Sequence, residues 1–157
     1  MKKLNAFLIE VLQTVNYHLA MKEYELTPIS TLTNNATEYE QVMELIRKNE
    51  APLRQVLHNG HIATELLIKA LLMKYLGQYE KTHNLQVLCQ YEFESNTQSI
   101  KRIYNLLDEN GLRNAYRGIR NAWTMNDRYN DGAVNKDEIE TKYNNFKEVI
   151  KWIQTQF

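Results

Sequence analysis

Arginine side chains recur along one stretch of the sequence at spacings that suit a helix. Arg113, Arg117, Arg120 and Arg128 follow one another at steps of four, three and eight residues, so a helix that continued to residue 128 would carry them on one side. A guanidinium group keeps its charge and offers a fork of donors that fits phosphate oxygens. The row therefore predicts a phosphate-binding face. The alternative is a solvated face whose arginines form salt bridges with acidic neighbours such as Glu65.

A second candidate is the pair Glu65 and Lys69, which lie four residues apart in the most hydrophobic stretch of the chain. On a helix surface such a pair contributes about 0.3–0.5 kcal/mol. Inside a bundle it would be costly unless other groups completed it, and a cation from the arginine row could do so. An ordinary surface pair and a buried structural or functional pair both stay open. Glu65 could also share a helix face with His58 and His61, and two histidines with a carboxylate can bind zinc. The sequence shows no further residue that would orient these ligands, so we predict no metal site.

The sequence offers little for nucleophilic or cofactor chemistry. The single cysteine, Cys89, has no histidine paired with it in sequence and is expected to pack as a small apolar side chain. The sequence contains no Gly-rich phosphate loop, nucleophile elbow or kinase signature. The residues alone therefore predict no catalytic group and no cofactor.

The elements that must position these side chains are predicted to be helices. Five Gly and two Pro in 157 residues disfavour a turn-rich sandwich or barrel. Apolar residues recur at three- and four-residue steps, and no segment of any length alternates as a strand does. The sequence predicts an all-α fold, an up-and-down bundle of about five main helices. The stretch from Pro52 to Leu76 belongs at its centre, Gly77 ends that helix, and Asn135 with Glu138 starts the last one as a capping box.

The remaining segments are predicted from the same patterns. We expect a helix over residues 2–21, a polar loop over 25–36 that acts as the only hinge, and a short helix over 82–91. A further helix carries Ile100 and Ile103, and another runs over residues 112–125.

Composition limits the partners and the location of the protein. Nineteen basic residues balance nineteen acidic ones, so binding of nucleic acid through overall charge is not expected, although a local basic face could still bind it. No apolar run is long enough to span a membrane, and no secretory signal is recognised at the N-terminus. With one cysteine and no disulfide, we expect a single-domain protein of 1–157 in the cytoplasm, without membrane contact.

Three elements of the sequence resemble the HEPN family. Ala63-Thr64-Glu65-Leu66-Leu67-Ile68-Lys69-Ala70 resembles the Ala-x-Glu-x-x-x-Lys-Ala helix of the family, and His83-Asn84-Leu85 resembles the His-(Asp/Asn)-Leu step that follows it. Arg128-Tyr129-Asn130-Asp131 is similar to the Arg-Tyr-Pro-Asp element, with Asn130 in place of Pro. The elements come in the family's order and cover residues 52–156 as a family-like core. Residues 1–50 lie outside the resemblance as an N-terminal helical extension.

The resemblance implies a helical bundle that forms homodimers and binds nucleotides or RNA. Many members are metal-independent ribonucleases, whose motif is Arg, often followed by Asn, with His a few residues later. Arg120-Asn121 begins that motif, but Met125 stands where the His is expected, and no His follows His83. The general acid–base group that RNA cleavage needs is therefore missing from its usual place.

We therefore predict a non-catalytic HEPN-like domain that binds a nucleotide or an RNA phosphate. A first alternative is a protein-interaction partner of a minimal nucleotidyltransferase, in a toxin–antitoxin or defence-type system. A second is a metal-independent endoribonuclease that uses His83 or Tyr129 instead. The predicted ligand-binding residues are Arg113, Arg117, Arg120, Arg128, Tyr129, Asp131, Lys69, Glu65 and His83.

Overall fold

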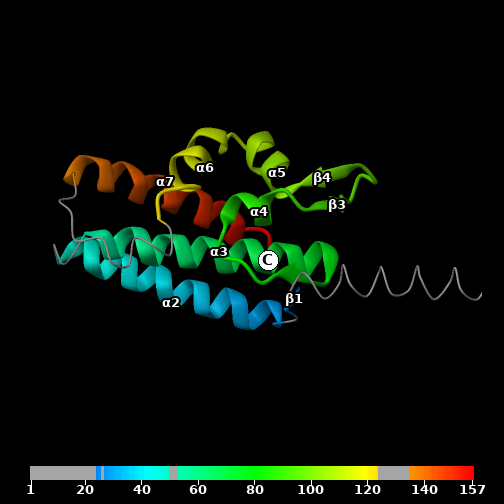
Figure 1. The fold of residues 1–157 in the computed structure, drawn as a ribbon, viewed down its shortest axis with the longest axis horizontal. Coiled ribbons are helices and arrows are strands. Elements are labelled where there is room, and N and C mark those ends of the chain that lie inside the picture. The colour runs from blue at the N-terminus through cyan, green and yellow to red at the C-terminus, as the bar shows by residue number, and fades with distance from the viewer. Residues whose placement is uncertain (1–23, 26, 50–52, 124–134) are drawn as a thin grey trace, which may run out of the picture.

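The computed structural model describes residues 24–25, 27–49, 53–123 and 135–157. Three long helices lie side by side within these segments, and shorter helices with two strand pairs complete the fold (Figure 1). The predicted all-α helical bundle is confirmed. The long helices are α2 (Ile29–Lys48), α3 (Arg54–Leu76) and α7 (Lys136–Gln154). The short elements are β1 (Tyr24–Glu25), β2 (Tyr79–Glu80), α4 (Leu85–Cys89), β3 (Glu92–Glu94), β4 (Ile100–Arg102), α5 (Ile103–Glu109) and α6 (Arg113–Ile119).

Helix α3 forms the centre of the bundle, as its hydrophobic sequence predicts. It packs against α2 and α7, and side chains such as Leu67, Ile68 and Leu71 are almost completely buried. A helix that is apolar on nearly all sides is stable only when neighbours cover it. It ends at Gly77, whose φ of 69° is left-handed and whose N–H donates to the Met73 carbonyl at 3.0 Å. The predicted stop is confirmed.

The three long helices approach closely at Gly60 of α3. A Cβ at this position would lie 2.7 Å from the ring of Phe146 on α7 and 2.9 Å from the sulfur of Met43 on α2. Both of those side chains are fully buried. The absent side chain therefore lets three helices meet one turn before Glu65.

The predicted polar loop over residues 25–36 is wrong from Ile29 onward, where α2 begins. Pro28 occupies the N-cap position of α2, where its missing N–H removes no hydrogen bond of the helix. The buried residues Leu32, Ala36 and Met43 recur at helical spacing, while the polar residues between them face solvent. The spacing of these apolar residues decides the structure of the segment despite its loop-forming residue types, because only a helix brings the apolar side chains onto α3.

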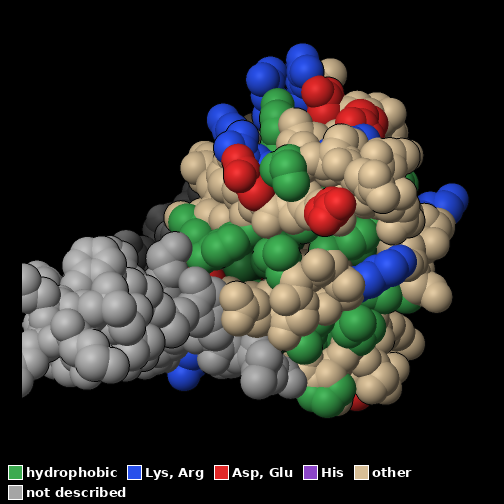
Figure 2. Space-filling model, turned by 90° about the vertical axis from the view of Figure 1, so that its right-hand side faces the viewer, with side chains coloured by type: hydrophobic (Ala, Val, Ile, Leu, Met, Phe, Trp, Pro, Cys, Tyr) green, Lys and Arg blue, Asp and Glu red, His purple; other side chains and the backbone are tan. Residues whose placement is uncertain are grey.

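Two short antiparallel strand pairs were not predicted. Tyr24 and Glu25 of β1 pair with β2, and Glu92–Glu94 of β3 pair with β4. Ile100, expected at the start of a helix, lies instead in β4, and α5 begins at Ile103. At the end of the molecule that carries β3 and β4, Lys and Arg side chains lie beside Asp and Glu side chains (Figure 2). Arg102 and Glu92, for example, form a salt bridge of 2.7 Å across these strands.

The helix predicted over residues 112–125 is shorter in the structure. Helix α6 ends at Ile119, and the chain then turns, with the Ala122 N–H donating to the Ile119 carbonyl at 2.9 Å. Helix α7 starts where predicted, because the Asn135 side chain accepts from the N–H groups of residues 137 and 138, but the Glu138 side chain accepts from Lys142 at 2.6 Å and does not complete the predicted capping box. The helix expected over residues 2–21 lies outside the described residues. Among the helices that are described, none is both long and apolar enough to span a membrane.

Candidate phosphate-binding cleft

Glu65 is the hub of a buried charged network near the middle of α3. Its side chain is 3% exposed, and its carboxylate accepts from the Lys69 ammonium at 2.8 Å. Nδ1 of His83, from the loop after β2, lies 3.1 and 3.2 Å from the two carboxylate oxygens. The Glu65–Lys69 pair is therefore buried, and a third group adds the further hydrogen bonds that a buried ion pair requires. That group is His83, not an arginine of the predicted row.

The surroundings of Glu65 favour its charged form. Burial, the largest single effect, raises the pKa of this carboxyl group, but the hydrogen bonds with His61 and Lys69 and the charges of Lys69 and His83 together outweigh burial. The net effect is a pKa below the ordinary 4.5. Lys69 also lies over the ring of Tyr79, with its ammonium 5.1 Å from the ring centroid. The carboxylate therefore stays ionised and holds the loop at His83 against α3.

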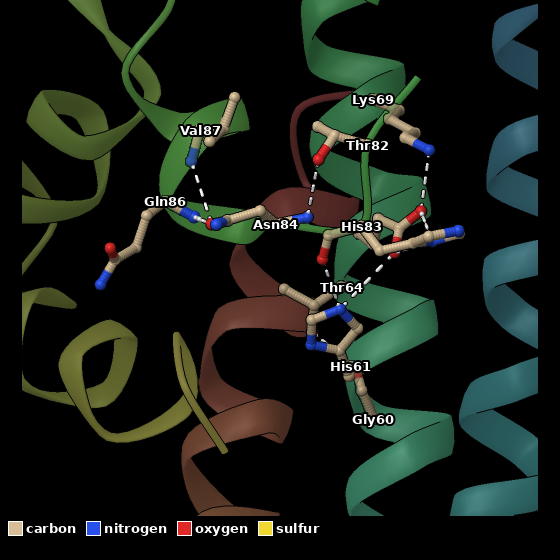
Figure 3. A network of polar contacts seen from close by, with 10 residues as sticks. Gly60, His61, Thr64, Lys69, Thr82, His83, Asn84, Gln86 and Val87 are labelled. Carbon is tan, nitrogen blue, oxygen red and sulfur yellow. Dashed lines mark hydrogen bonds and ion pairs between the residues drawn. The ribbon is translucent and has the colours of Figure 1, made fainter. Parts of the chain in front are cut away.

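His61 also links the loop after β2 to α3, through a hydrogen bond with the loop backbone. Its Nε2 is 2.9 Å from the His83 carbonyl oxygen and 3.5 Å from a carboxylate oxygen of Glu65 (Figure 3). A carbonyl oxygen only accepts hydrogen bonds, so Nε2 carries the proton. The loop of residues 81–84 is thus held to α3 by two contacts, one through the side chain of His83 and one through its backbone carbonyl.

A cleft of about 440 Å³ opens between this loop, α3 and the turn after α6. Lys81 and Arg120 contribute positive charge, and neither Asp nor Glu is among the lining side chains that belong to the described residues. The half-buried Arg120 forms no salt bridge with any carboxylate of the described residues. The lining residues are His61, Lys81, Thr82, His83, Asn84, Leu85, Arg120, Asn121 and Trp123.

Local packing fixes the position of Arg120 at the C-terminal end of α6. The Arg120 N–H donates to the Tyr116 carbonyl at 2.9 Å, and Tyr116 and Ile119 are buried in the core. Trp123, which is 4% exposed, lies against His58 and His61, with ring centroids 4.7 and 5.0 Å apart. The turn after α6 is therefore anchored on both sides of Arg120.

The other predicted arginines lie elsewhere. Arg113 forms a two-pronged salt bridge with Asp108, at 2.7 and 2.5 Å, and this hydrogen bond holds the pKa of Asp108 below its usual range. Arg117 is exposed and does not line the cleft. Of the arginines that the structure describes in the row, it brings only Arg120 to the cleft. Arg128, Tyr129 and Asp131 lie outside the described residues.

The predicted residues of the signature helix and the following loop lie together, but they do not all face the cleft. Glu65, Lys69 and His83 form one network. Figure 3 shows the His83 imidazole pointing toward α2, whereas Gln86 extends on the opposite side, toward α6. His83 therefore borders the cleft while its ring is bound to Glu65. Within the described segments, no three His, Cys, Asp or Glu side chains are arranged so that they could hold a metal ion.

Several cleft residues were missed by the sequence analysis as ligand-binding residues. Asn121 follows Arg120 in the matched motif, which was a usable signal. Lys81 and Trp123 carried none, because they come from separate elements that meet only in the fold, and His61 was considered only with His58 and Glu65 as a metal ligand. Cys89 is buried as predicted, and burial raises the pKa of its thiol to about 12, so it stays protonated.

Comparison with known proteins identifies the family. The HEPN domain family matches residues 29–156, which include α2 and so begin within the segment that the sequence motifs left outside. No curated protein and no solved structure matches the chain. The match includes α3, the loop of residues 81–84 and the turn after α6, which together line the cleft. The chain belongs to the HEPN domain family.

Proposed function

We propose that this HEPN domain binds the phosphate of a nucleotide or of RNA in the cleft beside Arg120. The observation that carries the proposal is a half-buried arginine that lines a cleft of about 440 Å³ and makes no salt bridge with a described carboxylate. A guanidinium group in that position offers several donors to an anion.

The charges around the cleft support an anionic ligand. Glu65, the buried carboxylate nearest the loop, is already neutralised by Lys69. The net charge of the chain is zero, so a positive cleft marks a local site rather than general attraction. Asn84 and Asn121 add amide groups to the lining, although the Asn84 oxygen caps α4.

Binding without cleavage agrees with the position of His83. Acid–base cleavage needs a group that can approach the substrate and exchange a proton with it. The His83 ring is held by Glu65 on the side of the loop that faces α2. Tyr129, the other alternative, lies outside the described residues. Ribonuclease activity would therefore need a proton-transfer group that has not been assigned, whereas ligand binding would not.

Two arginine variants test the proposal. Purified protein is titrated with labelled ATP, GTP and a short RNA at two salt concentrations. We expect Arg120→Ala to weaken the tightest of these interactions roughly tenfold or more, because a charged hydrogen bond is lost. Arg117→Ala, which changes an exposed arginine three residues earlier, in α6, is the matched control and should change affinity less than about twofold. Absence of binding to all three ligands, or equal losses in the two variants, contradicts the proposal.

A second candidate is a protein-interaction role, either as a homodimer or with a nucleotidyltransferase-type partner. The observation that favours it is an exposed apolar row on α2, formed by Tyr39, Val42 and Leu45 at 37%, 42% and 59% exposure. Light scattering of wild type and of Val42→Asp tests the homodimer. A monomer in both would remove the homodimer, and co-purification with the partner would then decide the other form.

A further inference from the structure

The outer flank of α2 carries an apolar row that the described elements leave exposed. Tyr39, Val42 and Leu45 follow one another at three-residue steps and lie at the surface of this helix. A shallow hollow beside Tyr39 and Val42 is lined also by Asn35 and Glu38. Large apolar side chains that gather on one exposed face mark a contact surface.

The neighbouring helices cover other faces of α2. Helix α3 packs along one of them, and on another Lys147 of α7 binds Glu40 at 2.6 Å and Glu44 at 2.8 Å. With 3.6 residues per turn, Tyr39 and Val42 lie on the flank of α2 away from these two carboxylates. Figure 1 shows α2 at the outer edge of the three long helices. The row therefore faces away from the bundle.

The segment before β1 has an apolar stripe of its own. Within the helix that the sequence predicts over residues 2–21, apolar residues recur at steps of four, three, four and four. A single amphipathic helix of this length is marginally stable in water, and packing of its apolar stripe supplies most of its stability. The segment therefore needs an apolar surface to pack on. The stripe consists of Leu4, Leu8, Val11, Val15 and Leu19.

Strand β1 fixes the point from which this segment can reach the bundle. It pairs with β2, and the Tyr79 hydroxyl of β2 donates to the Thr27 hydroxyl at 3.0 Å, two residues before α2 begins. Residues 20–23 link the stripe to β1, and four extended residues span about 13 Å. Two packed helices lie about 8–10 Å apart, axis to axis. The link is therefore long enough to turn the segment back along α2.

The length of the segment matches the position of the row. A helix of residues 4–19 is about 24 Å long, which equals the distance along α2 from its first residue to Leu45. A helix that runs back antiparallel to α2 therefore reaches the whole row. In that arrangement Leu8 lies beside Val42.

We propose that residues 4–19 fold back as a helix onto α2 and cover the row of Tyr39, Val42 and Leu45 within the same chain. A tether this short gives the segment an effective concentration of about a millimolar beside the row. A second copy of the chain, or a nucleotidyltransferase-type partner, would have to displace the segment before it could bind there. The inference goes beyond the phosphate site and does not depend on it.

A pair of cysteines in the full chain tests the arrangement. Leu8→Cys is combined with Val42→Cys under mild oxidation, since a disulfide forms only when the two Cα atoms lie within about 7 Å. Cys89 does not compete, because it is completely buried. We expect an intramolecular disulfide, seen as a faster-migrating monomer on a non-reducing gel. Its yield should be at least about fivefold higher than in Glu10→Cys/Val42→Cys, because Glu10 lies on the opposite side of the predicted helix from Leu8. A disulfide-linked dimer, or equal yields in the two pairs, overturns the proposal.

Hydrogen exchange of the full chain tests the contact without cross-linking. Packing on α2 should protect the backbone amides of residues 4–19, and Val42→Asp should speed their exchange about tenfold. Val87→Asp is the matched control, because it makes the same change at a similarly exposed valine of α4, and it should keep the protection. Protection that survives Val42→Asp, that falls equally in Val87→Asp, or that rises with protein concentration overturns the proposal.

Discussion

Two groups of charged side chains border the loop of residues 81–84, and they differ in how their charges are matched. On the α2 side, Glu65 is bound by Lys69 and His83, and the network is closed. On the α6 side, Arg120 lines a cleft to which the described part of the chain contributes no Asp or Glu side chain. A closed network stabilises structure because each buried charge has a partner. A cation without such a partner is instead available to a ligand, so the two groups should respond differently to mutation.

The largest effect is expected from opening the closed network. Glu65→Ala leaves the ammonium of Lys69, which is 5% exposed, without a counter-charge. We expect a loss of about 3–5 kcal/mol in the free energy of unfolding, measured by urea titration. Glu92→Ala, which removes the exposed partner of Arg102, serves as control and should cost less than about 1 kcal/mol. Similar losses in both variants would show that the Glu65 network is not a buried ion pair in solution.

The next effect concerns the salt dependence of ligand binding. Each phosphate contact made by a cation contributes to the slope of log affinity against log salt concentration. Arg120→Ala should reduce the size of that slope for RNA by about 1, whereas Arg113→Ala should leave it unchanged. Binding isotherms at several salt concentrations measure both slopes. An altered slope in Arg113→Ala alone would place the phosphate at the other end of α6.

The pH dependence of stability offers a smaller test of the closed network. Because the pKa of Glu65 is lower in the folded chain than its ordinary 4.5, the carboxylate stabilises the fold above that value. This contribution is lost as the pH falls through the lowered pKa. The difference in unfolding free energy between wild type and Glu65→Gln should therefore narrow on acidification from neutral pH to below 4.5. A difference that widens over this range would contradict the pKa direction.

The smallest effect is expected at the surface pair of α6. Arg113 and Asp108 are 51% and 33% exposed, so water screens their interaction. Arg113→Ala should change the free energy of unfolding by less than about 1 kcal/mol, as measured by thermal or urea unfolding. A larger loss would mean that this pair, despite its exposure, holds α6 in place.

Local sequence was sufficient for the elements whose residues act within one helix. The apolar surface of α3, its stop at Gly77 and the cap at Asn135 all follow from neighbouring residues. The start of α2 was missed because Thr31, Thr33 and the asparagines after them suit a loop equally well. Only their position opposite the buried side chains of that helix decides the outcome.

The cleft could be predicted only in part, because it depends on distant contacts. Arg120 was found through its spacing, but its separation from Arg113 depends on α6 ending at Ile119. That end is accompanied by the packing of Trp123 on His61, which no local pattern reveals. Glu65 was found through its spacing from Lys69, and His83 through the resemblance, while the contact between Glu65 and His83 emerged only in the fold.

Chemical-shift mapping by NMR tests the assignment of the cleft most directly. A short RNA is added to isotope-labelled protein, and backbone amide signals are followed. Binding at Arg120 predicts that the signals of residues 81–85 and 120–123, with the indole N–H of Trp123, move most, while those of residues 113–117 move little. Shifts concentrated at residues 113–117, or no shifts in either group at saturating RNA, would contradict a phosphate site in this cleft.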